Sequence, residues 1–506
     1  MIFINCVEKR SVGFFRPFFP ASLPYGIAYL MAMLRKENLP FDFFDEQVHL
    51  LTEQQINKIS GNYDKPLAFC ISFLTEATHR ALSITNWIKN HYPDSVTILG
   101  GIHVTALPEE ILANTSVDYV FTGEAENAII DIYNKILNKK SLADIKGIGY
   151  RKNEKNIINE RCPVINDLDD IPIIPYEIFA PYKKYDLGYI TSSRGCPYNC
   201  IFCNNNLTGS RKCRYNSTNK TIEELDLLIN KYNQTDITFF DDNFLSEHQR
   251  VYELCEHIEK KELNKKAQFM FQTRAKDVDP EIMKRLFTVG FKTVFFGIET
   301  VSEHLLRTIG KNENPGQIAS AVALAKKTGY KVIANYLYCL PGETTEDRKE
   351  CLRFSIQNNI DVVKFNNVVP YPGTRLFNTY NTTPFIRTMR DYRNYNSQLI
   401  LITPFWRKII FPFIPAKNTK QMIIHDTWSS YLKFYFRAKI LKSIVRDKKW
   451  GGILFRMGND TKEVIYNIPG AILLFFDLVI KIFGVLLKCF TRGFYKKQIE
   501  TNKQVY

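Results

Sequence analysis

The feature that most constrains the fold is an alternation of strand-like and helix-like segments over the first 380 of the 506 residues. Such alternation predicts parallel strands whose sheet is covered by helices. Strands are expected at 2–7, 41–45, 67–72, 95–99 and 119–122, and then at 187–193, 237–240, 267–274, 293–299, 331–338 and 362–365. The chain is too long for one core. We therefore expect a doubly wound α/β domain, followed by a barrel or part of one.

Ligands of parallel sheets bind beyond the carboxyl ends of the strands, so the loops there are candidate sites. In the first domain these loops contain Ser72, Gly100, Gly101, Gly123 and Glu124. In the second they contain a cysteine-rich loop, Asp241, Asp242, Arg274, Glu299 and Glu343. A helix cap or a surface charge is the preferred interpretation for Asp242 and Glu343. Repetition at successive strands favours function for Asp241 and Glu299, whereas Arg274 fits a ligand contact and a structural ion pair equally well.

Three cysteines in one short loop are the strongest chemical signal of the chain. Cys196, Cys200 and Cys203 lie four and then three positions apart, beside Gly195 and Pro197. A tight loop can turn three thiolates to one face, as a cubane iron–sulfur cluster requires, and three ligands leave one iron open to a small molecule. Zinc is the alternative, but structural zinc sites use four ligands and usually a second C-x2-C pair. The sequence favours a cluster.

This C-x3-C-x2-C pattern, with Phe202 before the last cysteine, resembles the radical S-adenosylmethionine (SAM) superfamily. The resemblance implies that the thiolates hold a 4Fe–4S cluster and that SAM chelates the fourth iron. An electron from the cluster would then cleave SAM to methionine and a 5′-deoxyadenosyl radical. The resemblance includes 241–244, 297–300, 340–344 and 370–374, although Cys339 stands where a glycine usually precedes the Leu-Pro pair. It implies SAM contacts from Phe202, Asp241, Asp242, Arg274 and Glu299.

The first domain resembles the cobalamin-binding domain that precedes the radical SAM domain in one large subfamily. The matching segments are 23–26, 99–103, 106–110 and 119–124. This implies cobalamin contacts from Ser72, Gly100, Gly101, Gly123 and Glu124. Many cobalamin proteins carry a D-x-H-x-x-G loop whose histidine ligates cobalt, but residues 8–13 contain no histidine. Cobalamin is therefore expected without that ligand, or the domain is a relic; His103 is expected to cap a helix.

The last quarter of the chain differs in charge from the rest. Residues 381–506 contain 22 of the 67 basic and 7 of the 52 acidic residues, so the whole excess of 15 positive charges lies there. Residues 472–490 are apolar except for one helical stripe of Asp477, Lys481, Gly484 and Lys488. Three charges argue against a spanning helix. A helix in the interface of an anionic membrane, or a core or dimer helix, remains.

The expected organisation is a cobalamin-binding-like Rossmann-type domain (1–165), a linker (166–184), a partial (β/α)6 TIM-like radical SAM barrel (185–385) and a basic, mainly helical C-terminal region (386–506). The eight other cysteines are scattered, which fits a reducing cytosol. We expect a cytoplasmic enzyme, peripheral on the inner face of the membrane.

The reaction that the resemblance implies is cobalamin-assisted methylation or ring formation at an unactivated carbon. The expected partners are a small-molecule or lipid-like substrate and a reductant such as flavodoxin or ferredoxin, and nucleic acid is not expected. A tRNA methylthiotransferase is the alternative enzyme, but its further cluster would need three cysteines and this domain has only the dispersed Cys6, Cys70 and Cys162. A membrane-recruited, non-catalytic iron–sulfur protein is the other alternative.

Overall fold

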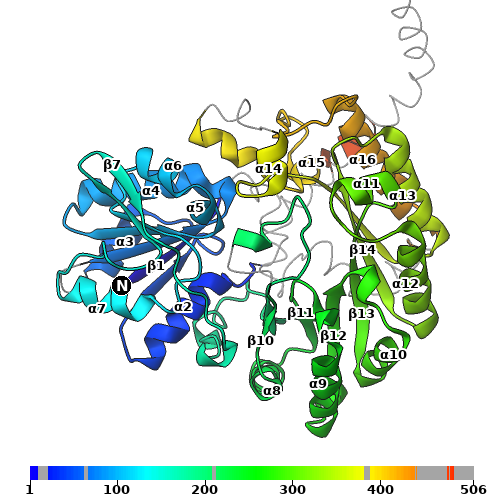
Figure 1. Cartoon of the computed structure of the whole chain (residues 1–506), viewed down its shortest axis with the longest axis horizontal. Helices are drawn as coiled ribbons and strands as arrows, with labels where there is room; N and C mark the ends of the chain where they lie inside the picture. Colours follow the sequence, from blue (N-terminus) through cyan, green and yellow to red (C-terminus); the bar gives the residue numbers. More distant parts are fainter. Residues whose placement is uncertain are drawn as a thin grey trace, which may run out of the picture.

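The computed structural model of the chain describes residues 1–8, 21–61, 67–207, 212–380, 388–438, 440, 476, 477, 479–481 and 483. Figure 1 shows two lobes side by side, the first domain in blue and cyan and the barrel in green, with yellow and orange C-terminal elements along one end of both. The fold confirms the predicted α/β class.

The first domain is built on a seven-stranded sheet in the order β2-β1-β3-β4-β5-β6-β7. Its strands are β1 (Ile2–Cys6), β2 (Asp42–Asp45), β3 (Ala68–Phe73), β4 (Val96–Gly100), β5 (Tyr119–Phe121), β6 (Ile148–Lys152) and β7 (Lys155–Ile158). The five predicted strands are present and pair in parallel. The last two form an antiparallel hairpin that extends the sheet beyond the doubly wound pattern.

Helices cover both faces of this sheet, as its apolar strands require. They are α2 (Tyr25–Lys36), α3 (Glu53–Ser60), α4 (Thr78–His91), α5 (Ile102–Ala106), α6 (Pro108–Ala113) and α7 (Ile129–Leu137). Strands β1, β3 and β4 alternate buried side chains between two hydrophobic clusters, one on each face. One of these clusters continues into the barrel, so the two domains pack against each other through apolar side chains.

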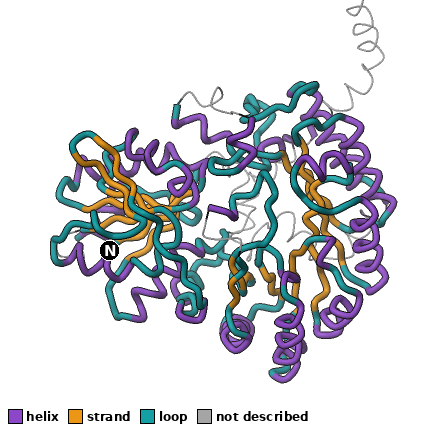
Figure 2. The backbone as a smooth tube through the Cα atoms, in the orientation of Figure 1, coloured by secondary structure: helices purple, strands orange, loops and turns teal. Residues whose placement is uncertain are grey.

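The second domain is a six-stranded, wholly parallel sheet whose strands follow chain order. Its strands are β8 (Tyr189–Ile190), β11 (Asp236–Phe239), β12 (Gln268–Thr273), β13 (Phe291–Glu299), β14 (Lys331–Tyr338) and β15 (Val362–Asn367). Its helices are α8 (Thr218–Asp226), α9 (His248–Lys260), α10 (Pro280–Val289), α11 (Glu303–Thr308), α12 (Pro315–Thr328) and α13 (Thr345–Gln357). Figure 2 shows the helices outside the curved sheet. This is the predicted partial barrel.

The described C-terminal elements close the barrel edge and reach back to the first domain. They are α14 (Arg375–Tyr380), the 3-10 helix η11 (Met389–Asn394), α15 (Leu399–Ile402) and α16 (Lys420–Tyr435). The hydroxyl of Tyr435 accepts a hydrogen bond from Val363 N at 3.2 Å and donates one to Val363 O at 2.8 Å, so α16 covers the edge strand β15. Arg393 in η11 forms an ion pair with Glu8 of the first domain at 3.0 Å.

Candidate cofactor site between the two domains

A cavity of about 500 Å³ lies where the carboxyl ends of the first sheet face the start of the barrel. Its first-domain wall includes Ser72, Gly100, Gly101, Gly123 and Glu124, which are the five residues that the sequence assigned to cobalamin. Its barrel wall includes Thr191, Ser193, Arg194, Gly195, Phe240 and Asp242. One cavity therefore joins the predicted cobalamin loops to the cysteine loop.

Two glycines explain the shape of the first-domain wall. Gly101 has φ +109°, and a Cβ there would lie 2.8 Å from Phe73 O, so only glycine permits the close approach of the β4 and β3 ends. Gly123 has φ +91°, and a Cβ there would meet nothing within 4 Å. Its N–H donates to Thr105 Oγ1 at 3.0 Å, which fixes the loop while its surface stays open to the cavity. At these two glycines the wall of the cavity is therefore formed by backbone atoms and not by side chains.

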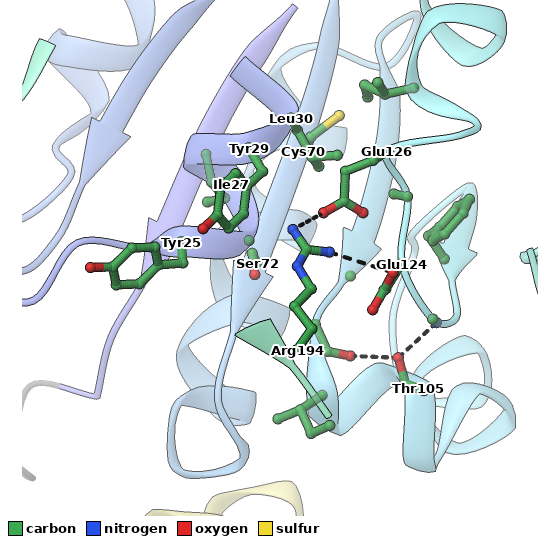
Figure 3. Close-up of a pocket in the computed structure, with 18 of the residues that line it drawn as sticks. Tyr25, Ile27, Tyr29, Leu30, Cys70, Ser72, Thr105, Glu124, Glu126 and Arg194 are labelled. Carbon is green, nitrogen blue, oxygen red and sulfur yellow. Dashed lines mark hydrogen bonds and ion pairs between the residues drawn. The ribbon is translucent and has the colours of Figure 1, made fainter. Parts of the chain in front are cut away.

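Buried ion pairs join the two domains across the cavity wall (Figure 3). Arg214 donates to both carboxylate oxygens of Glu124, at 2.5 and 2.9 Å. Arg194 lies 3.4 Å from Glu124 and 2.7 Å from Glu126, and its guanidinium stacks over the Tyr29 ring at 4.6 Å. Because Arg194 directly precedes the Gly195–Cys196 turn, the same residue holds the cavity wall and the start of the cysteine loop.

The cysteine loop leaves the short strand β9 (Ser193–Arg194), which pairs with β10 (Arg214–Tyr215). Gly195 has φ +97°, a conformation that favours glycine and turns the chain into the loop. The far side of the loop is tied to the barrel, because Ile201 N donates to Ile309 O at 3.0 Å and Ile201 O accepts from Leu376 N at 2.8 Å. Phe202 packs into the neighbouring apolar cluster. The loop is therefore held at both ends.

The three thiols act on one another electrostatically, as side chains of one small loop. Burial is the largest cause that raises the pKa of Cys196 to about 12; Asp242, Cys203 and Cys200 contribute in the same direction, and a hydrogen bond with the Tyr198 backbone acts against them. Burial also raises the pKa of Cys200, whereas Lys311 and Arg274 lower it. Within the described ranges, no three His, Cys, Asp or Glu side chains converge to hold a single metal ion. A cubane distributes its thiolates over separate irons, so the three cysteines need not converge on a single point to hold a cluster.

The neighbouring carboxylates Asp241 and Asp242 have different environments. Asp241 is fully buried and accepts hydrogen bonds from Ser192 N at 2.6 Å, Ser193 N at 2.9 Å and Ser192 Oγ at 2.6 Å. It holds the chain that leads into the cysteine loop. Asp242 is exposed, lines the cavity and raises the pKa of Cys196 and Cys203. Of the two, Asp242 is the carboxylate that a ligand can reach.

Arg274 has hydrogen-bonding capacity that the described chain does not use. Its side chain is buried, and its guanidinium lies 3.6 Å from the centre of the Tyr198 ring in the cysteine loop. Nε donates to Glu313 at 3.3 Å, but neither terminal nitrogen has a hydrogen-bond partner. A buried guanidinium with two unsatisfied nitrogens is costly unless a ligand pairs with it.

Lys311 and Glu313, two charged residues that lie beside Arg274 and Glu299, were not selected from the sequence. Lys311 lies 3.4 Å from Glu313 and 3.9 Å from Glu299, and all three side chains are buried. Glu299 has φ +65°, and its other oxygen accepts from Asn335 Nδ2 at 3.0 Å. A non-glycine residue in this conformation is strained, and such strain concentrates at functional sites. The Gly-Lys pair at 310–311 follows a helix rather than a strand, so the strand-end rule did not select it.

Glu343 and His103, which the sequence analysis also considered, are buried in the protein core. Glu343 is buried and accepts from Cys339 N at 2.7 Å and Arg348 Nη1 at 2.7 Å, so it is a core ion-pair member and not a helix cap. His103 lies within α5 as a buried side chain, and burial lowers its pKa to about 3. All eight histidines are in the part of the chain that the structure describes, and none lines the cavity. Of the 8–13 loop, only Glu8 lies within the described residues.

The structure thus joins a parallel-sheet domain to a six-stranded partial barrel with a three-cysteine loop, and one cavity lies between the two domains. Comparison with known proteins identifies the class to which this arrangement belongs. The family model of the radical SAM superfamily matches residues 190–355, and that of the B12 binding domain matches residues 21–132. The chain belongs to the radical SAM superfamily and carries a B12 binding domain. Its cofactors are therefore a 4Fe–4S cluster, SAM and cobalamin.

Similar proteins cover most of the chain. An uncharacterized methyltransferase of Pyrococcus horikoshii is 31% identical over 442 residues, which span 86% of this chain and 91% of that protein. The anaerobic magnesium-protoporphyrin IX monomethyl ester cyclase of Rubrivivax gelatinosus is 24% identical, over 84% of this chain and 76% of that protein. The solved structure of the cobalamin-dependent SAM radical enzyme OxsB with aqua-cobalamin bound has a TM-score of 0.67 at 17% identity, over 97% of this chain and 81% of that chain.

These matches favour a cobalamin-dependent radical SAM enzyme over the two alternatives, the tRNA methylthiotransferase and the non-catalytic iron–sulfur protein. They do not test the individual cofactor contacts, which stay predictions. Within the residues described, none of the helices has the length and hydropathy to span a bilayer.

Proposed function

We propose that this enzyme methylates, or closes a ring at, an unactivated carbon of an apolar small-molecule or lipid-like substrate. The observation that supports this most is the single cavity shared by the five cobalamin-loop residues and by Gly195 and Asp242 beside the cysteines. The bound cofactors supply radical hydrogen abstraction and methyl transfer. A shared cavity allows both to act on one substrate without its release.

The cysteine loop and its neighbours are the proposed cofactor contacts. Cys196, Cys200 and Cys203 hold the cluster, and the unpaired nitrogens of Arg274 bind the carboxylate of SAM. Asp242 faces the cavity and accepts from the amino group of SAM, while Asp241 positions the loop from behind. Glu299, Lys311 and Glu313 set the charge around Arg274. Ser72 and the three loop glycines at 100, 101 and 123 surround cobalamin.

The substrate and partners follow from the surfaces around the cavity. Leu74 and Phe240 line the cavity and are largely exposed, which favours a substrate with an apolar surface. The related cyclase acts on a magnesium-protoporphyrin ester, which has such a surface. A flavodoxin or ferredoxin is the proposed reductant. The basic C-terminal region is proposed to hold the enzyme on an anionic membrane surface.

The reaction is tested with the reconstituted enzyme, a reductant and SAM that carries an isotopically labelled methyl group. An apolar extract of cells lacking the gene supplies the candidate substrates. We expect a product in which the labelled methyl group is attached to carbon. Cleavage of SAM without label transfer, but with loss of hydrogen from a substrate, would favour ring formation.

Cobalamin is expected to bind without a histidine ligand from the protein, because no histidine lines the cavity. The electron paramagnetic resonance spectrum of the bound Co(II) form should lack nitrogen hyperfine splitting from an imidazole of the chain. The His103→Ala variant should give the same spectrum, since His103 is buried in α5 and does not line the cavity. Imidazole splitting that disappears in any histidine variant would contradict this.

Replacing Arg274 by Gln is expected to weaken SAM binding by roughly 10–100-fold, because charged hydrogen bonds contribute about 1.5–3 kcal/mol. The iron content should stay unchanged, since Arg274 is not a cluster ligand. SAM affinity is measured from the SAM-induced change in the spectrum of the reduced cluster. Arg285→Gln is the matched control, because Arg285 pairs with Glu259 on α9, whereas Arg274 lies against Tyr198 of the cysteine loop. Equal affinities in the two variants would remove Arg274 from the site.

A further inference from the structure

The described helical residues near the C-terminus have their polar side turned inward. Asp477 is fully buried, and its Oδ1 accepts a hydrogen bond from Phe405 N at 2.7 Å. Lys481, one turn later, forms an ion pair with Asp477 at 2.6 Å and donates to Leu401 O at 3.4 Å. Its ammonium also lies 5.1 Å from the Trp428 ring of α16. Asp477 and Lys481 therefore attach this segment, drawn red beside α16 in Figure 1, to the body of the protein, whereas Gly484 and Lys488 of the predicted stripe lie outside the described residues.

The apolar side of the same segment faces outward. Phe476 is 56% exposed, Phe483 is 62% exposed, and Val479 and Ile480 between them are each more than 40% exposed. These four residues are spaced three, one and three positions apart, so they share one helical face. A helix that serves as a core element would bury this face and expose its charges. The observed polarity is the reverse.

A neighbouring loop extends the same surface. Phe405 is joined to Asp477 through its backbone N–H, and its ring meets the Trp406 ring edge-on at 5.0 Å. Both rings are about half exposed, at 47% and 52%. The next two residues, Arg407 and Lys408, are exposed cations. Loop and helix together present aromatic and aliphatic side chains with basic groups beside them.

We propose that this surface, formed by Phe405, Trp406, Phe476, Val479, Ile480 and Phe483, docks on the interface of an anionic lipid bilayer. Interfacial segments combine an apolar face with flanking Lys and Arg, and tryptophan is enriched at the level of the lipid headgroups. The charge of the protein favours a lipid bilayer over a second copy of the chain as the partner of this surface. Each copy carries a net charge of +15, and the whole excess lies in its last quarter. Such copies repel each other, whereas anionic headgroups attract them.

The proposal rests on the membrane role proposed above for the C-terminal region and names the surface that performs it, but it is independent of the reaction, because none of the six residues lines the cofactor cavity. The full-length protein should sediment with vesicles that contain phosphatidylglycerol and much less with pure phosphatidylcholine vesicles. High salt should reduce this binding only partly, since the apolar contacts are not screened. The double variants Phe405→Ser/Trp406→Ser and Phe476→Ser/Phe483→Ser should each weaken binding by about 100-fold.

Leu137→Ser is the matched control, because Leu137 is an equally exposed apolar residue, at 54%, on the first domain. It should leave vesicle binding unchanged, and all variants should keep the wild-type iron content and thermal midpoint. As an independent readout, brominated lipids should quench fluorescence that is lost in Trp406→Phe. The proposal is overturned if neither double variant weakens binding, if the wild type stays in the supernatant at low salt, or if the double variants instead dissolve a dimer seen by light scattering.

Discussion

Replacing Cys196, Cys200 and Cys203 together by Ala is expected to remove essentially all of the iron, about four atoms per chain, and all reductive cleavage of SAM. The reason is that the three thiols belong to one tight loop that is tied to the barrel at Ile201, and a cubane with one open iron requires three thiolates. Iron analysis and the spectrum of the reduced cluster measure the first loss. Detection of 5′-deoxyadenosine measures the second.

Cys213 provides a strict control, because it lies beside the loop without belonging to it. Its Sγ is 3.6 Å from Gly195 O. If three ligands suffice, Cys213→Ala keeps its iron and still cleaves SAM. Iron loss in this single variant would show a fourth protein ligand, and the open iron that SAM requires would then be absent.

The fold was predictable because its strands are uniform apolar runs that end in recognisable loops. All eleven predicted strands lie in the two main sheets, and α10 and α12 begin at a proline after a capping residue. The hairpin of β6 and β7 was not predicted, because its two short strands, IGYRK and KNII, are not uniform apolar runs. Cys339 has φ +69°, a conformation that favours glycine, the residue that the family resemblance led us to expect before this Leu-Pro turn.

The site was predictable only in part, because strand-end position says which loop a residue occupies but not where its side chain points. Asp241 and Asp242 are adjacent in sequence, yet one lies in the core and the other in the cavity. The long-range pairs of Glu124 with Arg194 and Arg214 join segments 70 and 90 residues apart, and no local pattern reveals them. The apolar outward face near residue 480 likewise depends on which side of the helix finds a partner.

Glu124→Gln is expected to lower the free energy of unfolding by about 3–5 kcal/mol, the cost of breaking a buried ion pair. Glu124 faces two arginines, so the variant leaves Arg214 without its bidentate partner and Arg194 with Glu126 alone. Because these pairs join the two walls of the cavity, cobalamin binding should weaken as well, while the iron content stays unchanged. Denaturant unfolding and cobalamin absorbance measure the two effects.

Two comparisons separate this interdomain role from a general loss of charge. Glu160→Gln removes an exposed pair with Lys146 in the same domain and should cost less than about 1 kcal/mol. Combining Glu124→Gln with Arg214→Gln should cost less than the sum of the single variants, because the second change removes the charge that the first left unpaired. Additive costs, or cobalamin binding that survives Glu124→Gln intact, would mean that these ion pairs do not hold the cavity together.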